Sequence, residues 1–156
     1  MKVRRAETDD AADACAVIRQ SIEELCQLDH GGDQTCLAAW LSNKTADNVR
    51  RWIRQTNFFV AEESGSIVGV AAMTDAGKIT LNYVAPHARF RGVSKALMLR
   101  LEEQARSLGV SECWVESSQT ALRFYRALGY VSSRRSDALP LTGSLALVLT
   151  KPLQGP

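Results

Sequence analysis

The sequence contains few of the residues that indicate metal or membrane chemistry. Only two of its 156 residues are histidines, His30 and His87, so a metal site has little to be built from. No apolar run approaches the roughly 20 residues needed to cross a bilayer, and the first residues lack the apolar core of a secretory signal. We therefore expect a cytoplasmic protein that holds no metal ion and does not bind a membrane.

Cysteines are also few, and the four present are Cys15, Cys26, Cys36 and Cys113. Their spacing matches no zinc-binding pattern, and two of them fall within predicted helical periodicity. Because disulfides are rare in a reducing cytoplasm, we expect buried free thiols, with disulfides as the alternative.

The net charge is small, with 19 basic and 17 acidic residues, and it gives no reason to expect nucleic-acid binding. Positive charge is nevertheless concentrated in one stretch, residues 87–106, which contains five basic side chains against two acidic ones. This local excess is enough for a ligand that carries phosphate groups. The length suits a single domain over residues 1–156, and a hydrophobic content of 46% allows a substantial core.

Periodicity and turn residues divide the chain into a clear order of elements. We expect strands at residues 2–6, 58–61, 67–73, 78–85, 113–116, 130–133 and 144–150, and helices at 9–28, 33–43, 46–55, 92–108 and 120–128. Turns are expected at residues 64–66, 75–77 and 140–143, and a frayed tail at 152–156. The order predicts an α+β (α/β) protein with a mixed, mostly antiparallel sheet of six to seven strands and helices on both faces.

Residues 81–101 hold the most informative local pattern. An apolar run ends at Pro86, a basic turn follows, and Gly92 opens a helical pattern. The first turn of a helix has N–H groups without an intrahelical partner, and these bind anions. Arg89, Arg91 and Lys95 surround that position with positive charge, and glycine at 92 leaves the backbone accessible. Alone, the pattern is equally compatible with a basic, solvated surface turn.

A second pattern occurs in residues 118–130, where Ala121, Phe124, Tyr125, Gly129 and Tyr130 are spaced along a predicted helix and the turn after it. The two patterns together resemble the GNAT N-acetyltransferase superfamily, whose usual forms are Gln/Arg-x-x-Gly-x-Gly/Ala and Asn-x-x-Ala-x-x-Phe-Tyr-x-x-x-Gly-Phe. The element order of the family is similar over nearly the whole chain. This sequence departs from both patterns. Ser94 stands where the family has Gly or Ala, although serine is still small, and Ser118 replaces the asparagine.

The resemblance implies that the protein binds acetyl-coenzyme A. It places the pyrophosphate on the N–H groups of the basic turn and the pantetheine arm beside the end of the preceding strand, which splays from its neighbour in the family. A main-chain N–H within residues 82–84 would stabilise the oxyanion. The coenzyme-binding residues so implied are Val84, Ala85, Arg89, Arg91, Gly92, Val93, Ser94, Lys95 and Ser118.

Catalytic side chains follow less directly from the sequence. The resemblance makes Tyr125 the general acid for the leaving thiolate, although the residue could simply pack beside Phe124. Glu116, at the end of a predicted strand, is a possible base. The other groups available are Asn82, Tyr83, Glu23, Glu24, Asp29 and His30. The acceptor would bind near His30, Trp40 and Asn82; His30 could instead be a turn residue, and Trp40 part of the core.

We therefore expect an N-acetyltransferase in which the primary amine of a small molecule or peptide attacks the acetyl-CoA thioester directly. Homodimers are common in similar proteins, so the resemblance allows a homodimer here. The alternative is a non-catalytic acyl-CoA-binding sensor with the same fold. The off-pattern Ser94 and Ser118 favour the alternative, whereas the presence of Tyr125 favours the enzyme.

Overall fold

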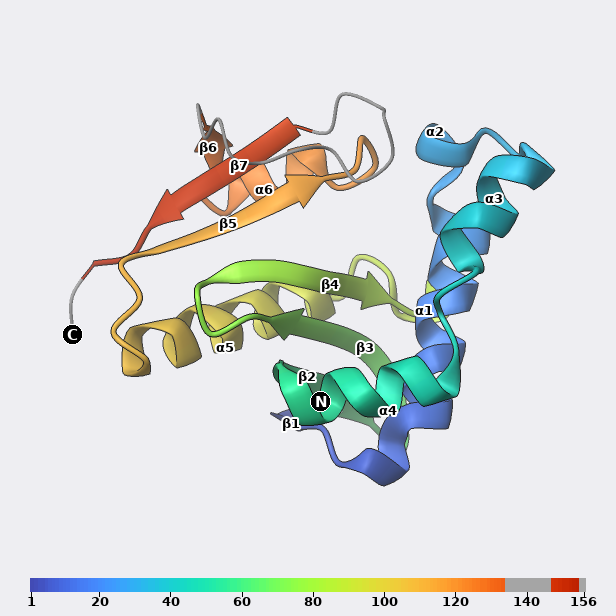
Figure 1. The fold of residues 1–156 in the computed structure, drawn as a ribbon, viewed down its shortest axis with the longest axis horizontal. Coiled ribbons are helices and arrows are strands. Elements are labelled where there is room, and N and C mark those ends of the chain that lie inside the picture. Colours follow the sequence, from blue (N-terminus) through green and yellow to red (C-terminus); the bar gives the residue numbers. More distant parts are fainter. Residues whose placement is uncertain (134–146, 155–156) are drawn as a thin grey trace.

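A computed structural model describes residues 1–133 and 147–154 (Figure 1). The strands and helices occur in an order close to the predicted one. The elements are β1 (Lys2–Arg5), a 3-10 turn (Thr8–Asp10), α1 (Ala11–Leu25), α2 (Gln27–His30), α3 (Gln34–Leu41), α4 (Ala46–Gln55), β2 (Asn57–Glu63), β3 (Ser66–Met73), β4 (Lys78–Val84), a 3-10 turn (Pro86–Ala88), α5 (Val93–Ser107), β5 (Glu112–Ser117), α6 (Leu122–Ala127), β6 (Val131–Ser132) and β7 (Leu147–Pro152).

The strands form a seven-stranded sheet in the order β1-β2-β3-β4-β5-β7-β6. All neighbouring strands are antiparallel except β4 and β5, which are parallel. In Figure 1, α5 runs behind the sheet, whereas α4 crosses in front of it. The mixed, mostly antiparallel sheet and the α+β class predicted from the sequence are therefore confirmed.

Helix ends lie where capping chemistry allows them. The Asp33 carboxylate accepts hydrogen bonds from the N–H groups of Thr35 and Cys36 and starts α3, and the Thr45 hydroxyl accepts one from Asn48 and starts α4. Gly31, with φ of 57°, ends α2 in the left-handed region. The predicted stop after residue 28 is therefore correct to within two residues.

Two predictions about element ends were wrong. The single helix predicted at 9–28 is interrupted at Cys26, whose φ of −103° and ψ of 32° are not helical, and so it forms α1 and α2. Pro152 was expected in a frayed tail, but it is the last residue of β7 and pairs with Glu112. The predicted turn at 140–143 and the start of the predicted last strand lie outside the described residues.

All four cysteines are free. Cys15, Cys26 and Cys113 are buried, as expected, whereas Cys36 is exposed. Within the described ranges, no helix is long and apolar enough to cross a membrane.

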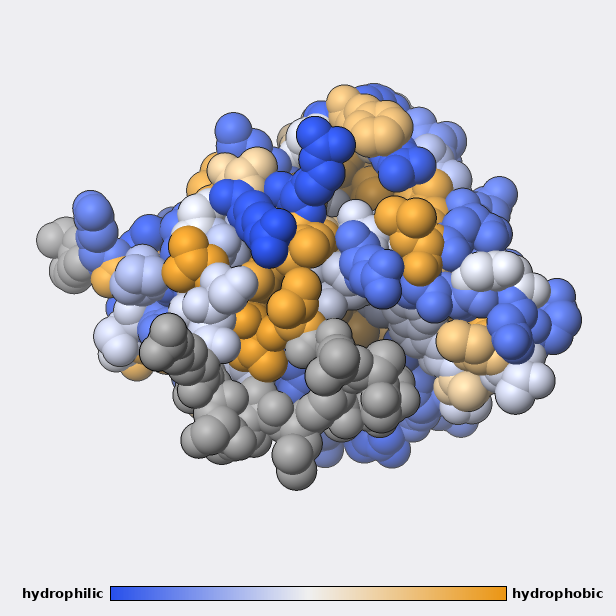
Figure 2. All heavy atoms as spheres, turned by 90° about the horizontal axis from the view of Figure 1, so that it is seen from above, coloured by the Kyte–Doolittle hydropathy of each residue, from blue (hydrophilic) through white to orange (hydrophobic). Residues whose placement is uncertain are grey.

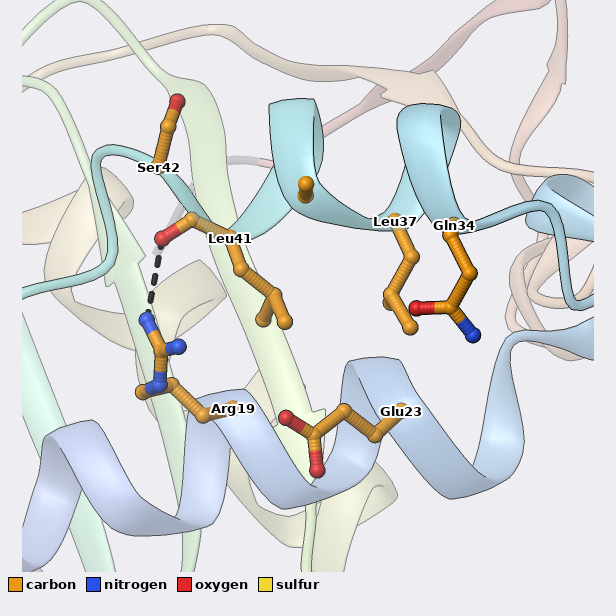
Figure 3. Close-up of a pocket in the computed structure, with 7 residues that line it drawn as sticks. Arg19, Glu23, Gln34, Leu37, Leu41 and Ser42 are labelled. Carbon is orange, nitrogen blue, oxygen red and sulfur yellow. Dashed lines mark hydrogen bonds between the residues drawn. The ribbon is translucent and has the colours of Figure 1, made fainter.

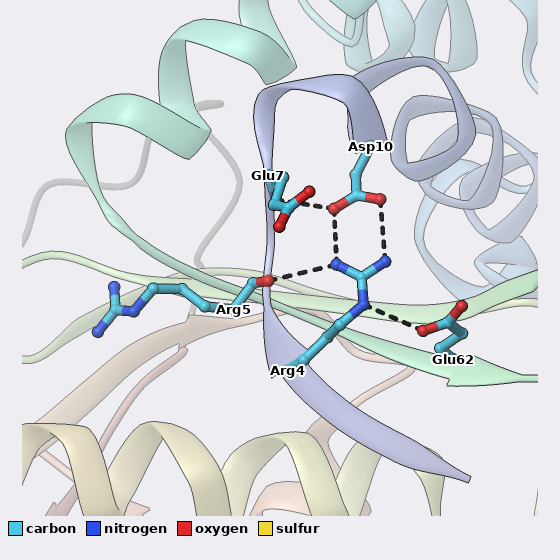
Figure 4. Close-up of polar contacts among 5 residues, drawn as sticks. All are labelled: Arg4, Arg5, Glu7, Asp10 and Glu62. Carbon is cyan, nitrogen blue, oxygen red and sulfur yellow. Dashed lines mark hydrogen bonds and ion pairs between the residues drawn. The ribbon is translucent and has the colours of Figure 1, made fainter.

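The N-terminal strand is anchored by Arg4 (Figure 4). Its guanidinium donates to both carboxylate oxygens of Asp10, at 2.8 and 3.0 Å, and through Nε to Glu62 on β2 at 3.0 Å. Such a planar, two-pronged contact holds Asp10 firmly, and the bonded arginine keeps the pKa of this carboxyl below its usual value. The start of α1 is thereby fixed against the edge of the sheet.

Helix α5 lies unusually close to β3. A Cβ atom added to Gly69 would lie 2.5 Å from Val93 Cγ1 and 2.9 Å from Leu97 Cδ1, so only glycine fits without movement of these side chains. Gly69 pairs with Val84 of β4. The close approach therefore sets the first turn of α5 beside the end of β4.

A buried carboxylate joins α5 to β7, near one edge of the sheet. Glu102 is 1% exposed, and it accepts hydrogen bonds from Lys151 Nζ on β7 at 2.8 Å and from Tyr130 Oη at 3.1 Å. Burial, together with the neighbouring charge of Glu102, raises the pKa of Tyr130, so the phenol stays protonated and donates. Because Tyr130 follows α6, this cluster fixes the C-terminal part of the fold to α5.

We expect Glu102→Ala to lower the free energy of unfolding by about 3 kcal/mol, because it leaves a lysine and a phenol without their buried partner. Urea denaturation measures this change. The matched control is Glu103→Ala, which removes a 73% exposed side chain 3.9 Å from Arg100 and should cost less than about 0.5 kcal/mol. Equal losses in the two variants would contradict the role given to Glu102.

Candidate active site

Strands β4 and β5 separate shortly after they begin. Within the described residues, the β4–β5 pairs are Lys78 with Trp114 and Ile79 with Val115, whereas the pairing of β4 with β3 continues to Val84. In the β3–β4 register, Met73 pairs with Ile79 and Ala72 with Leu81, so β4 has one extra residue. Such a bulge bends a strand and increases its twist. Figure 1 shows the ribbons of β4 and β5 diverging beyond this point.

The bend exposes main-chain groups of β4. Ala85 N–H donates to Val68 on the β3 side at 2.8 Å, and main-chain groups along an antiparallel strand alternate in direction. The N–H and C=O groups of Asn82 and Val84 therefore point away from β3, toward the side that β5 has left. They are available to a ligand that enters between the two strands.

The first turn of α5 offers further N–H groups. Ala96 N–H donates to Gly92 at 3.0 Å, and so the N–H groups of Val93, Ser94 and Lys95 precede the first intrahelical bond. Among the residues that the structure describes, no side chain caps this end. Gly92 has φ of 79°, and a Cβ atom there would meet nothing within 4 Å. Glycine is required by the left-handed conformation, and the space around it stays open for an anion.

Positive charge flanks this first turn. Arg91 forms an ion pair with Glu63 at the end of β2, and its side chain is half exposed. The Arg89 guanidinium lies 4.5 Å from the centre of the Phe90 ring, and that ring is 90% exposed. Arg89 and Arg91 therefore precede Gly92 directly, and Arg91 has an acidic partner.

Tyr125 reaches β4 from α6. Its side chain is buried, and its Oη accepts a hydrogen bond of 3.1 Å from Asn82 Nδ2. Burial raises the pKa of Tyr125 to about 12, and the bond from Asn82 opposes this shift. The ring also packs edge-on against Phe124 and Tyr130, with centroids 5.3 and 5.6 Å away. Tyr125 is thus both a packed residue and a neutral phenol beside the separated part of β4.

Ser118 serves the turn before α6. Its Oγ accepts a hydrogen bond from Ala121 N–H at 3.2 Å. The same turn is held by Asp29 of α2, whose carboxylate accepts from Gln119 N–H at 2.7 Å and from Thr120 N–H at 3.2 Å. Asp29 therefore links α2 to the segment that carries Tyr125. No local sequence pattern indicated this contact, because the partners are 90 and 91 residues apart.

The residues expected near the acceptor include two with contacts inside the fold. His30 is buried, and its Nδ1 accepts from Gly32 N–H at 3.0 Å, so Nε2 carries the proton and donates to Ile22 O at 2.9 Å. Trp40 lies edge-on to His30, with ring centroids 6.2 Å apart. Burial raises the pKa of Tyr83 on β4, and a contact with Trp40 opposes the shift. Trp40 is therefore close to the strand that lines the opening.

Glu116 lies just beyond the last β4–β5 pair. Its carboxylate is 3.4 Å from Lys78 Nζ, and its side chain is 12% exposed. Lys78 also lies over the Trp114 ring at 5.0 Å. The position suits contact with a ligand between the strands, but the charge of Glu116 is partly balanced. In the part of the chain that the structure describes, no cluster of His, Cys, Asp or Glu is arranged to hold a metal ion.

A cavity of about 470 Å³ lies between α1 and α3. Figure 3 shows Arg19 and Glu23 pointing from α1 toward α3, and Leu37 and Leu41 pointing back. The Arg19 guanidinium is held by Leu41 O at 3.0 Å. None of the lining residues belongs to the first turn of α5 or to α6, so the cavity shares no residue with these parts of the site around Tyr125.

The surface of the molecule also shows mixed character. In the view of Figure 2, apolar side chains gather in the middle of the face and hydrophilic ones lie on both sides. A ligand with both apolar and charged parts can contact such a face.

The sequence matches the family model described as an acetyltransferase (GNAT) domain over residues 23–138. A glucosamine 6-phosphate N-acetyltransferase from Trypanosoma brucei brucei is 33% identical over 106 residues, which are 62% of this chain and 72% of that protein.

The fold is similar to solved structures over nearly its full length. A GCN5-related N-acetyltransferase from Rhodopseudomonas palustris superposes with a TM-score of 0.86 and 26% identity, covering 97% of this chain and 95% of that one. The PaiA N-acetyltransferase from Thermoplasma acidophilum, solved in complex with coenzyme A, gives a TM-score of 0.79 and 15% identity over 97% and 98% of the two chains. Because the family model covers most of the sequence, this protein belongs to the GNAT acetyltransferase family.

Proposed function

We propose that this protein transfers an acetyl group from acetyl-CoA to the primary amine of a small molecule. The observation that carries the proposal is the position of Tyr125, whose hydroxyl group lies against β4 where β4 has left β5. Two findings support it. One similar structure was solved with coenzyme A, and one relative is named for glucosamine 6-phosphate, a small amine.

In this proposal the coenzyme is held mainly by main-chain groups. The N–H groups of Val93, Ser94 and Lys95 bind the pyrophosphate, and Arg89 and Arg91 supply positive charge. The pantetheine arm runs beside Val84 and Ala85 and takes the place that β5 would otherwise occupy. Ser118 shapes the turn on the opposite side of the opening, through its bond to Ala121 N–H.

The chemical step then needs a donor for the oxyanion and an acid for the leaving sulfur. The amine nitrogen attacks the acetyl carbon, a C–N bond forms, and the carbonyl oxygen becomes an oxyanion that accepts from the outward N–H of Asn82 or Val84. One such donor is worth about 3 kcal/mol. The C–S bond breaks, and Tyr125 provides a proton to the sulfur. Because its pKa is about 12, the phenol first acts as a hydrogen-bond donor to the leaving sulfur.

The amine must also lose a proton. A primary ammonium has a pKa of about 10.4, so a base assists at neutral pH. Glu116 is the candidate, because it follows the last β4–β5 pair and its carboxylate lies 3.4 Å from Lys78 Nζ. Asn82 and Trp40 border the same opening and would contact the acceptor.

A thiol-release assay with acetyl-CoA and a panel of small amines tests the reaction. We expect Tyr125→Phe to lower kcat about tenfold to a hundredfold, because general acids contribute on this scale, and to leave the Kd of coenzyme A within about twofold. Tyr130→Phe is the control, since it removes a hydroxyl bound to Glu102 rather than one at β4. It should affect stability more than kcat.

Two outcomes contradict the proposal in different ways. Coenzyme A binding in calorimetry without turnover of any amine would indicate the non-catalytic acyl-CoA-binding sensor. Full activity of Tyr125→Phe would exclude Tyr125 as the acid.

The proposed coenzyme turn, residues 89–95, can be tested separately. Arg91→Ala should raise the Kd of coenzyme A roughly fivefold, because a half-exposed charge-assisted bond is worth about 1 kcal/mol. Glu63→Gln should lower this Kd, since it frees Arg91 from its ion pair. Arg106→Ala removes the same charge from the far end of α5, where the side chain contacts Gln154 O, and should change nothing. Calorimetry at low and high salt measures all three; an unchanged Kd in Arg91→Ala would place the phosphates elsewhere.

A further inference from the structure

The side-chain amide of Asn82 has two different ends. Its Nδ2 donates to Tyr125 Oη at 3.1 Å. Its Oδ1 is fully buried and, among the described residues, has no hydrogen-bond partner. The residue sits in the part of β4 that β5 does not cover, and its own main chain points into the opening.

Such an arrangement costs stability. A buried carbonyl oxygen without a donor is unfavourable, whereas an aliphatic side chain of similar shape would avoid this cost. Within the described residues, the side chain of Asn82 makes one hydrogen bond, to a residue in the proposed active site. Local arrangements that disfavour folding are typical of functional positions.

The contact also controls where the phenol hydrogen points. A phenol hydroxyl has one hydrogen to donate and lone pairs that accept. Asn82 Nδ2 donates to this oxygen and cannot accept from it. The Tyr125 hydroxyl hydrogen is therefore free to be donated to another acceptor. The flanking rings of Phe124 and Tyr130, with centroids 5.3 and 5.6 Å away, hold the Tyr125 ring in place.

We propose that Asn82 is the positioning residue for Tyr125. Its amide donates a hydrogen bond to the phenol oxygen from the β4 side and thereby directs the hydroxyl hydrogen toward the sulfur of the departing coenzyme. This role rests on the proposed acetyl transfer. It differs from the contact with the acceptor expected from the sequence, because Asn82 acts here through another residue.

Asn82→Leu separates this role from a structural one. It removes both amide groups and fills the same space, so the free energy of unfolding should stay the same or rise. Turnover should fall at least tenfold, while the Kd of coenzyme A stays within twofold. Asn82→Ala is the second variant and should show the same loss of turnover. If activity falls only in proportion to stability across both variants, Asn82 is merely structural and the proposal is overturned.

A double-mutant cycle tests the connection to Tyr125. In the Tyr125→Phe background no hydroxyl remains to be directed, so Asn82→Leu should lower kcat by less than about twofold further. Losses that multiply would show that Asn82 acts independently of Tyr125, and would overturn the proposal.

A measurement without turnover completes the test. In protein labelled with ¹³C at the hydroxyl-bearing carbon of tyrosine, Tyr125→Phe identifies the Tyr125 signal. Asn82→Leu should shift that signal and leave the Tyr130 signal unchanged; an unshifted Tyr125 signal would exclude the hydrogen bond. If the wild type acetylates no amine, the proposed function fails and this role fails with it. An active wild type with multiplying losses overturns only the role of Asn82.

Discussion

The separation of β4 from β5 is the constraint on which the site depends. An extra residue in β4 bends the strand away from β5 beyond Ile79. The bend leaves the main-chain groups of Asn82 and Val84 facing outward, and it opens the space that Tyr125 reaches from α6. A continuous sheet would satisfy those groups internally. The same irregularity thus leaves main-chain groups open to an extended ligand and gives access to the proposed acid.

The parts of the fold that bring the site together are tied by buried contacts. Gly69 lets α5 approach β3 and places its first turn beside Val84. Glu102 connects α5 with β7 and with the residue after α6. Asp29 connects α2 with the turn before α6. The proposed coenzyme turn, the proposed acid and the helices expected to receive the acceptor are therefore held by separate contacts.

Local patterns predicted the elements because their signals lie within a few residues. Gly92 needs a left-handed backbone, and α4 has the predicted limits because Thr45 caps it. Contacts between distant segments left no local signal. Asn82 and Tyr125 are 43 residues apart. The buried His30 is held by Ile22 of α1 and by Gly32 of its own turn, and composition alone could not distinguish these contacts from a ligand contact. The acceptor side stays the least predictable part for that reason.

A crystal structure with bound coenzyme A tests the central claim most directly. The account predicts that the pantetheine arm lies between β4 and β5, that its amides bond to the main chain of Asn82 or Val84, and that the sulfur is within hydrogen-bond distance of Tyr125 Oη. An arm lying elsewhere, or a sulfur atom far from Tyr125, would contradict it.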